Sequence, residues 1–457
     1  MNTETQIKDT GVVCTPDNFT ISREKIDENK NIKLTDTQDG LEMFCSVNSD
    51  NSLILKRTRG IIFDGNIIVS RGYPHCDEFT SDQPDMIKSF LNNSLKDCSI
   101  YDAHEGAMIR VFYYSNRWWV VTHKKLDAFA SKWSSSESFG DMFVKSLEAE
   151  IENNVFLKKK VGSLNGKDTL HKFYSTLDRN NQYMFLVRNN KDNRIVCNAP
   201  ERYTLYHVGT IVNGQYITMS VDIGIPKPRK HDFTSIDELL EFVNTLSYKE
   251  YQGVIVFTNT MDGDVVKIFT PEYREFFAVR GNEPILKMRY LQVRLSAKQN
   301  NLIYQLYPEM ASEFDEIENN LYDLAKTIME SYKTRYIKPF QTEEPAPFVR
   351  IPDEEFTILK TLHEWHKEDR KSNRVSVQKV IEIMNKQSAN SLFKMLRRQA
   401  SPNEQTENKT KTPSLLLNAK YSKDKKFLNK TRPSRDGQGT TNSVENAHRN
   451  SLKKKFC

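Results

Sequence analysis

Residues 101–133, with the sequence YDAHEGAMIRVFYYSNRWWVVTHKKLDAFASKW, decide the fold expected for this chain. An acidic residue and a glycine, Glu105 and Gly106, precede two runs rich in apolar and aromatic residues. Ser115 and Asn116 stand between these two runs. Two such runs separated by two residues of this kind predict a β-hairpin.

The second run of this hairpin ends in His123, Lys124 and Lys125. Low-dielectric walls strengthen a charge interaction placed at their rim, so a buried hairpin with this edge can form the floor of a phosphate-handling site. A core hairpin that ends in a solvated basic turn would carry the same pattern. The rest of the chain has to decide between these two interpretations.

The composition predicts a globular, intracellular protein. The chain has 457 residues, of which 38% are hydrophobic, and two or three domains follow from roughly 150 residues per domain. There is no uncharged apolar run of about 18 residues and no secretory signal, so we expect no membrane association. Widely spaced cysteines without a C-x-x-C pair argue against disulfides and zinc, and we expect no metal site. These cysteines are Cys14, Cys45, Cys76, Cys98, Cys197 and Cys457.

Positive charge is concentrated at the C-terminal end of the chain. The formal net charge is +6, but residues 401–457 contain 13 Lys+Arg and 5 Asp+Glu, so the preceding 400 residues are slightly negative. This segment is also poor in apolar residues, which predicts a disordered basic tail. The tail residues expected to bind nucleic acid are Lys425, Lys426, Lys453, Lys454 and Lys455.

The order of the expected elements predicts an α+β fold with antiparallel sheets, followed by a helical domain. We expect a loosely ordered segment over 1–44, an α+β domain over 45–295, a helical domain over 300–398 and the disordered tail over 401–457. The expected strands are 53–55, 60–63, 67–69, 183–187, 194–196, 203–212, 215–221, 254–257 and 265–269. The expected helices are 85–95, 134–152, 168–177, 235–246, 302–336 and 353–395.

Five short segments, taken in order, resemble the tailed-phage RNA ligases of the tRNA-repair type. They are RGIIF at 59–63, the Glu105-Gly106 hairpin, NRIV at 193–196, QGVIV at 252–256 and VKIF at 266–269. The likeness covers roughly residues 50–295 and implies an antiparallel nucleotidyltransferase domain. In that family a lysine attacks the α-phosphate of ATP, with magnesium, and the adenylyl group passes to a nucleic-acid 5′-phosphate.

The residue that carries the chemistry of this family is missing from the first motif. That motif has a lysine, any residue, an acidic residue and a glycine, and here Ala103 takes the lysine position before Glu105 and Gly106. Alanine has no amine that could form the covalent intermediate. His104, Lys124 and Lys125 are the remaining weak candidates for a relocated nucleophile.

Three further positions depart from the ligase pattern. The strand expected at 183–187 lacks the usual glutamate, and Gln252 replaces a glutamate that helps to hold metal. Of two phosphate-binding lysines, Lys267 remains and Phe269 replaces the other. The resemblance therefore favours a domain that keeps the ligase fold without its catalysis.

Two longer phrases, at 105–133 and 266–294, look like the immediate-early protein family of iridoviruses. This resemblance implies a regulator that binds nucleotide or nucleic acid, RNA or DNA, in the infected host cell; it identifies no protein partner. The residues expected to contact nucleotide or phosphate are Glu105, Gly106, Arg59, Lys267 and Arg194, and Arg280, Lys287 and Arg289 are expected to contact nucleic acid. The alternatives are an active ATP- and Mg-dependent ligase with a relocated lysine, and a protein-interaction scaffold.

Overall fold

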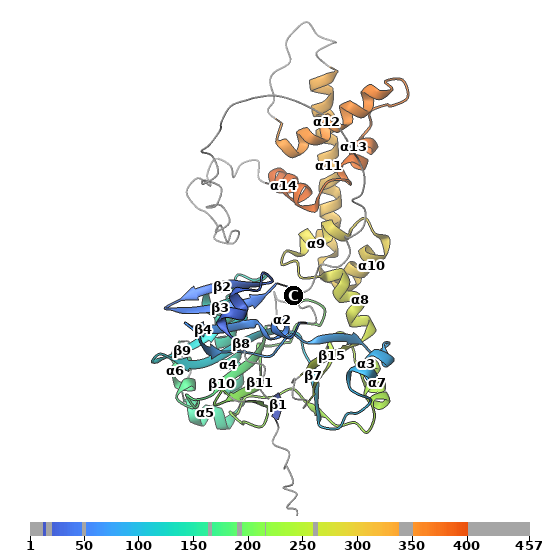
Figure 1. The fold of residues 1–457 in the computed structure, drawn as a ribbon. Helices are drawn as coiled ribbons and strands as arrows, with labels where there is room; N and C mark the ends of the chain where they lie inside the picture. Colours follow the sequence, from blue (N-terminus) through green and yellow to red (C-terminus); the bar gives the residue numbers. More distant parts are fainter. Residues whose placement is uncertain are drawn as a thin grey trace, which may run out of the picture. The chain divides into compact units, whose positions relative to one another are not determined.

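The computed structural model describes residues 12–14, 21–47, 52–162, 167–189, 194–214, 216–258, 264–337 and 351–400 (Figure 1). The chain divides into two compact units. The first unit comprises Met1–Asn319 with Asn385–Asn390, and the second comprises Asn320–Met384 with Ser391–Cys457. The basic tail predicted over 401–457 lies outside the described residues.

The first unit contains three sheets, and the prediction of an antiparallel α+β fold is confirmed. The strand orders are β1-β12-β11-β10-β8-β9, β13-β7-β14-β15-β6 and β2-β3-β4-β5. Within the described residues only β15 and β6 pair in parallel. The strands are β1 Val12–Cys14, β2 Ile32–Gln38, β3 Leu41–Ser46, β4 Arg59–Asp64, β5 Ile67–Ser70, β6 Asp77–Thr80, β7 Cys98–Ala103, β8 Ala107–Tyr114, β9 Arg117–Val121, β10 Gln182–Arg188, β11 Thr204–Val212, β12 Tyr216–Thr218, β13 Lys230–His231, β14 Gly253–Thr258 and β15 Val265–Phe269.

The predicted central hairpin is formed by β8 and β9. Tyr113 pairs with Trp118 across the hairpin, and the two turn residues Ser115 and Asn116 have φ values of 48° and 62°. Positive φ at both central residues is the geometry of the turn that matches the twist of antiparallel strands. The polar turn residues therefore fix the register that buries Val111 and Val121.

The six-stranded and five-stranded sheets face each other across a shared core. Alternate residues of a strand point to opposite faces. In β10, Met184 faces the shared core, whereas Phe185 packs against helices on the outer face. In β14, Phe257 likewise faces the shared core and Val256 faces outwards. Residues of both sheets therefore line the space between them.

Helices cover the outer faces of these two sheets. Helices α4, α5 and α6 pack on the six-stranded sheet, while α3 and α7 lie side by side on the five-stranded sheet (Figure 1). These helices are α3 Pro84–Phe90, α4 Phe139–Asn153, α5 Val155–Val161, α6 Lys167–Tyr174 and α7 Ile236–Thr245. The helices predicted over 85–95, 134–152, 168–177 and 235–246 are confirmed, with shorter bounds.

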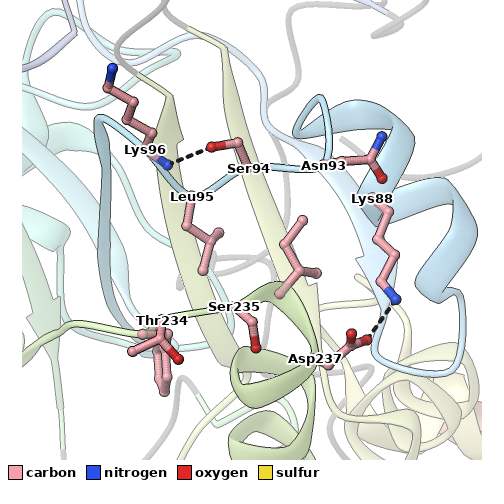
Figure 2. A pocket seen from close by; sticks show the side chains of 10 residues that line it. Lys88, Asn93, Ser94, Leu95, Lys96, Thr234, Ser235 and Asp237 are labelled. Atoms are coloured by element: carbon pink, nitrogen blue, oxygen red, sulfur yellow. Dashed lines mark hydrogen bonds and ion pairs between the residues drawn. The ribbon is translucent and has the colours of Figure 1, made fainter.

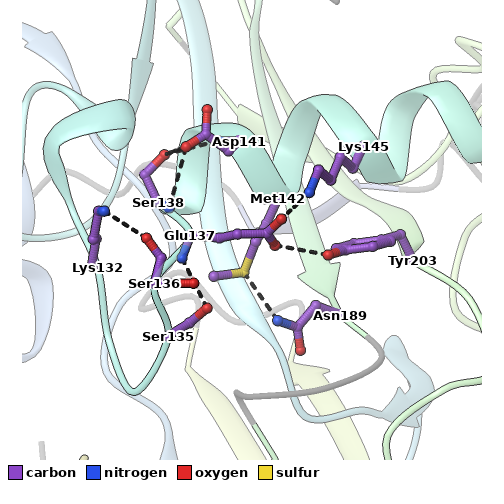
Figure 3. A network of polar contacts seen from close by, with 10 residues as sticks. All are labelled: Lys132, Ser135, Ser136, Glu137, Ser138, Asp141, Met142, Lys145, Asn189 and Tyr203. Carbon is purple, nitrogen blue, oxygen red and sulfur yellow. Dashed lines mark hydrogen bonds and ion pairs between the residues drawn. The ribbon is translucent and has the colours of Figure 1, made fainter.

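The start of α4 is held by a polar network that follows the central hairpin (Figure 3). Ser138 and Asp141 form a capping box, in which each side chain bonds the backbone of the other. Glu137 lies between Lys145 and the hydroxyl of Tyr203, and both side chains donate hydrogen bonds to it. These contacts join the segment before α4 to α4 itself and to Tyr203, which precedes β11.

The four-stranded sheet packs against the hairpin and differs most from the prediction. Residues 53–55, predicted as a strand, belong to helix α2, Leu53–Arg57, because Leu55 turns into the core while the Thr58 hydroxyl bonds the carbonyl of Ile54 at 2.7 Å. The segment 1–44, predicted to be loosely ordered, contains α1, Arg23–Asp27, all of β2 and part of β3.

Two other segments also depart from the predicted strands. Residues 194–196 form no strand, because the backbone N–H groups of Ile195 and Val196 bond a carboxylate instead of a neighbouring strand. The strand predicted over 215–221 is reduced to β12. The turn predicted at Asp262-Gly263 lies outside the described residues.

The C-terminal part of the described chain is helical, as predicted. The long helix predicted over 302–336 is interrupted at Pro308, and the one predicted over 353–395 is split into three. The helices are α8 Pro271–Arg280, α9 Leu286–Val293, α10 Ala297–Leu306, α11 Ala311–Tyr336, α12 Asp353–Glu368, α13 Val377–Met384 and α14 Ala389–Ala400. None of the described helices combines the length and hydrophobicity needed to cross a membrane.

Candidate phosphate-binding site

The position expected for the nucleophilic lysine is buried and carries only a methyl group. Ala103 is the last residue of β7, is 4% exposed and pairs with Gly253 of β14. Its carbonyl accepts a hydrogen bond of 2.9 Å from the backbone N–H of Gln252. Ala103 therefore contributes backbone hydrogen bonds and an apolar surface, but no reactive group.

Glu105, predicted as a nucleotide contact, is a buried anchor of the fold. Its carboxylate accepts hydrogen bonds from the backbone N–H of Val196 at 2.8 Å and of Ile195 at 3.3 Å. The Tyr273 hydroxyl of α8 donates a third bond of 3.0 Å. Burial raises the pKa of Glu105, while these hydrogen bonds oppose that rise. The adjacent Gly106 leaves no room for a side chain, because a Cβ would lie 2.7 Å from the Val187 carbonyl.

A chain of hydrogen bonds connects Lys267 to this anchor. The Lys267 ammonium donates to the Gln252 side-chain oxygen at 3.2 Å, and the Gln252 amide nitrogen donates to the Tyr273 hydroxyl at 2.8 Å. Tyr273 in turn donates to Glu105. The direct partner of Lys267 is thus a neutral amide, and Lys267 forms no ion pair within the described residues.

A small cavity lies between the two facing sheets, beside Lys267. Its volume is about 90 Å³, well below the roughly 300–1,000 Å³ of typical ligand pockets, so a whole nucleotide does not fit without movement of the walls. The lining residues are mostly apolar: Tyr73, Tyr101, Asp102, Ala103, His104, Met108, Leu186, Val208, Met219, Pro228, Ile255, Phe257 and Lys267.

His104, a weak candidate nucleophile, is held in an aromatic stack beside this cavity. Its ring lies parallel to Tyr206 with centroids 4.8 Å apart and also contacts Tyr251 at 5.1 Å. Burial, reinforced by the positive charge of Arg188, lowers the pKa of His104 to about 4, so the ring is neutral at pH 7. The stack gives His104 a packing role.

Five basic side chains converge near the rim of the hairpin, and we call them the cation cluster: Arg59, His75, Arg110, His123 and Lys124. Burial and the charges of Arg59 and Lys124 lower the pKa of His75 to about 4. Burial and the other four members lower the pKa of His123 to about 3. With both imidazoles neutral at pH 7, the positive charges of the cluster are those of Arg59, Arg110 and Lys124.

No carboxylate neutralises this cluster within the described residues. Arg110 is buried and donates to the Gly60 carbonyl and to the Ser70 hydroxyl at 3.1 Å, both uncharged acceptors. No ion pair is recorded there for the side chain of Arg59 or of Lys124. Burial raises the pKa of the Cys76 thiol, the charges of Lys267 and Arg59 lower it, and the charges of Glu78 and Asp77 raise it. Cations and carboxylates therefore both lie near Cys76.

Close backbone contact brings β4 to the end of the hairpin. Gly60 has φ of +70°, and a Cβ there would lie 2.6 Å from the backbone oxygen of His123. We expect Gly60→Ala to lower the free energy of unfolding by about 2 kcal/mol or more, because it combines a backbone clash with left-handed strain. Thermal unfolding would measure it. Gly65→Ala is the matched control, since Gly65 has φ of +55° and nothing within 4 Å of its Cβ position; equal losses in both variants would contradict the close contact.

Lys125, a weak candidate nucleophile, and Arg194, a predicted phosphate contact, are both engaged elsewhere. The Lys125 ammonium lies 3.2 Å from the Asp36 carboxylate of β2, so Lys124 and not Lys125 has its charge available. Arg194 pairs with Glu309 at 2.8 Å and donates to the Leu306 carbonyl at 2.6 Å. Arg194 thus fastens its loop to the helical segment that follows.

The arginines and lysine predicted to bind nucleic acid near α8 and α9 also have structural partners. Arg280 is 2% exposed and donates to the Tyr307 hydroxyl and to the Glu283 carbonyl. Arg289 donates to the carbonyls of Ala278 and Val279 at the end of α8. Lys287 pairs with Glu313 at 2.8 Å. The predicted lysines of the tail lie outside the described residues.

A larger, open hollow of about 560 Å³ lies between the end of α3 and the start of α7 (Figure 2). None of the predicted site residues lines it. Lys88 is paired there with Asp237 at 2.7 Å, and the Ser94 hydroxyl accepts a bond from the backbone N–H of Lys96. We therefore place the candidate site at the cation cluster. Within the described residues no group of three or more His, Cys, Asp or Glu side chains is arranged to hold a metal ion.

Comparison with known proteins gives homologues for most of the chain. No family model matches it. The immediate-early protein ICP-46 homologue of Invertebrate iridescent virus 6 is 28% identical over 350 residues, which is 72% of each chain. The immediate-early protein ICP-46 of Frog virus 3 (isolate Goorha) is 25% identical over 307 residues, which is 65% of this chain and 74% of the relative.

Solved structures with similar folds are ATP-dependent ligases. A putative ATP-dependent DNA ligase from Aquifex aeolicus has a TM-score of 0.36 and 13% identity, over 66% of this chain and 74% of the ligase. An archaeal ATP-dependent RNA ligase has a TM-score of 0.34 and 10% identity, over 83% and 79%. At these TM-scores the likeness carries no argument about function. Over most of its length, the chain is similar to the immediate-early proteins named ICP-46, and its curated homologues are proteins of iridoviruses.

Proposed function

We propose that this chain binds the phosphate groups of a nucleotide or a nucleic acid without forming a covalent bond to them, and that it serves a regulatory role early in infection. The observation that carries the proposal is the cation cluster without a neutralising carboxylate in the described residues. Arg59 offers a planar guanidinium with several donors, and Lys124 offers an exposed ammonium. A phosphate group would supply the negative charge that the fold itself does not place there.

The residues at the motif positions support binding without catalysis. Ala103 has no amine to attack ATP, and it lies 4% exposed in a packed strand. The side-chain oxygen of Gln252 accepts a hydrogen bond from Lys267 and its nitrogen donates one to Tyr273, so the amide is not free to hold magnesium. Lys267, next to the cavity, would extend the positive surface from the cation cluster into the cleft.

We expect the double substitution Arg59→Ala and Lys124→Ala to weaken ATP binding by at least about tenfold, because each charge-assisted hydrogen bond to phosphate contributes on the order of 1.5–3 kcal/mol. Isothermal titration calorimetry with ATP and magnesium at fixed salt would measure the affinity. Arg117→Ala is the matched control, since Arg117 lies at the other end of β9 and pairs with Asp39 at 2.5 Å. Equal affinities of the double variant and the wild type would contradict the proposal.

The competing function is an active adenylyltransferase that uses a relocated lysine. Two observations on Lys124 support this alternative: the residue is exposed, and it forms no ion pair within the described residues. Incubation with labelled ATP and magnesium, followed by denaturing electrophoresis, separates the two functions. A covalent adduct that disappears in Lys124→Ala or Lys125→Ala would establish the enzyme. If neither ATP nor single-stranded RNA or DNA binds at all, the protein-interaction scaffold becomes the better hypothesis.

A further inference from the structure

We propose that phosphate binding at the cation cluster is linked to proton uptake by His75 and His123, so that the site binds phosphate more tightly as the solution becomes mildly acidic. This inference rests on the proposed function and deepens it. It assigns a regulatory role to two histidines that no motif of the sequence requires.

The two imidazoles come from separate segments and meet in one cluster. His75 follows β5, where its backbone N–H donates to the Lys56 carbonyl at 2.8 Å and its Nε2 lies 3.0 Å from the Ser46 hydroxyl. His123 follows β9, and its backbone is pressed against Gly60. Within the described residues no hydrogen-bond partner is recorded for Nδ1 of His75 or for either ring nitrogen of His123. These nitrogens remain available to a ligand.

The charged groups around the histidines are almost all positive. Arg59 comes from β4, Arg110 from β8 and Lys124 from the end of the hairpin. Arg59 and Lys124 act on both histidines, whereas Arg110 and His75 act on His123. The thiols of Cys45 and Cys76 lie close to the same guanidinium groups.

The nearest carboxylates on the adjoining strand β6 already have partners. Asp77 pairs with Lys56 at 2.6 Å, and Glu78 pairs with Arg274 at 2.8 Å. In the free protein a proton on His123 would therefore join three permanent cations, and a proton on His75 would join two of them, in a partly buried site. Burial first, and then these positive charges, lowers the pKa of both imidazoles, so both are neutral at pH 7.

A bound phosphate reverses this balance. An anion within about 4–6 Å of a histidine favours the protonated ring, and each added ring proton becomes a charged hydrogen-bond donor to phosphate oxygen. The ligand-bound histidines therefore have a higher pKa than those of the free protein, which is about 4 for His75 and about 3 for His123. By linkage, affinity then rises as the pH falls through the bound-state pKa, by up to about tenfold per pH unit for each proton taken up.

Calorimetry can count these protons. ATP is titrated into the full chain between pH 5.5 and 7.5, in pairs of buffers that differ in ionisation enthalpy, and the wild type is compared with the double variant His75→Gln, His123→Gln. Because the ligand is the same, its own titration cancels in the comparison. At the acidic end of this range we expect the wild type to take up as much as about one proton more per bound ATP than the variant, and its affinity to rise by up to about tenfold more per pH unit.

The outcomes separate this inference from the proposed function. If ATP binds to both proteins with the same proton uptake and the same pH slope, the linkage is overturned and phosphate binding stands. If the wild type binds no ATP, phosphate binding itself is overturned, and the linkage with it. If the double variant fails to fold, the imidazole resonances of His75 and His123 in the wild type give the answer by NMR. An increase of about two pKa units or more on addition of ATP, which is what proton uptake within this pH range requires, supports the linkage, and unchanged titration overturns it.

Discussion

Glu105→Ala is expected to lower the free energy of unfolding of the first unit by about 3–5 kcal/mol. The substitution removes the acceptor of two backbone N–H groups, those of Ile195 and Val196, and of the Tyr273 hydroxyl. Each buried donor left without an acceptor costs about 1–3 kcal/mol. Since a domain is typically stable by only about 5–15 kcal/mol, this single change removes a large share of its stability.

Urea unfolding followed by tryptophan fluorescence would measure the loss, because Trp118, Trp119 and Trp133 all lie in the first unit. Glu78→Ala is the control, since Glu78 forms an exposed ion pair with Arg274 that is worth at most about 1 kcal/mol. A Glu105→Ala variant as stable as the control would show that Glu105 is free to contact a ligand, and that its role as an anchor is wrong.

Acidification is expected to destabilise the first unit, and His207 supplies about 3 kcal/mol of that loss. His207 is fully buried, and its Nε2 donates to the Gly209 carbonyl at 3.1 Å. Its Nδ1 is buried without a partner, so a second proton would create an unsatisfied donor. Burial first, and then the charge of Lys227, lowers the pKa of His207 to about 4 from 6.5.

The sign follows from proton counting. Between pH 6.5 and about 4 the unfolded chain binds a proton at this position that the folded chain does not, so stability is lost as the pH falls through that window. Glu105 and Glu150 act in the opposite direction, because burial raises the pKa of both carboxyls. The contribution of His207 must therefore be isolated with a variant.

His207→Gln isolates it, because glutamine can still donate to the Gly209 carbonyl but cannot gain a charge. Urea unfolding at several pH values would measure the free energy of unfolding of both proteins. The difference, variant minus wild type, should increase by about 3 kcal/mol when the pH is lowered from 7 to 4. His171→Gln on the exposed face of α6 serves as the control and should show a much smaller change. Parallel pH curves for wild type and His207→Gln would contradict the prediction.

Local sequence signals predicted the parts of the fold that depend on neighbours along the chain. Ser115 and Asn116 encode the turn of the central hairpin because both accept positive φ, and Ser235 encodes the start of α7 by accepting the backbone N–H of Glu238 at 3.1 Å. Short segments without a clear period were less predictable. Three apolar residues at 53–55 fit a strand or one turn of helix equally, and tertiary packing of Leu55 decides between them.

The candidate site could be predicted only in part. Arg59 and Lys124 were found because they sit beside recognisable hairpins, but nothing in the local sequence links them to His75 or Arg110. Those residues meet only because the four-stranded sheet packs against the end of the central hairpin. Conversely, Arg194 and Arg280 look like free cations in the sequence, and the structure engages them with Glu309 and Tyr307.

The hydrogen bonds from Lys267 through Gln252 and Tyr273 to Glu105 have a fixed direction. The ammonium has no lone pair, so Gln252 must present its oxygen to Lys267 and its nitrogen to Tyr273. Flipping the amide would set its nitrogen against the Lys267 ammonium, and the Tyr273 hydroxyl could then donate to the amide oxygen only by giving up its bond to Glu105. The side-chain amide of Gln252 thus has one stable orientation in this chain of hydrogen bonds. A glutamate in place of Gln252 would bring a negative charge to Lys267, and an incoming anion would then meet a much weaker electric field at the mouth of the cleft.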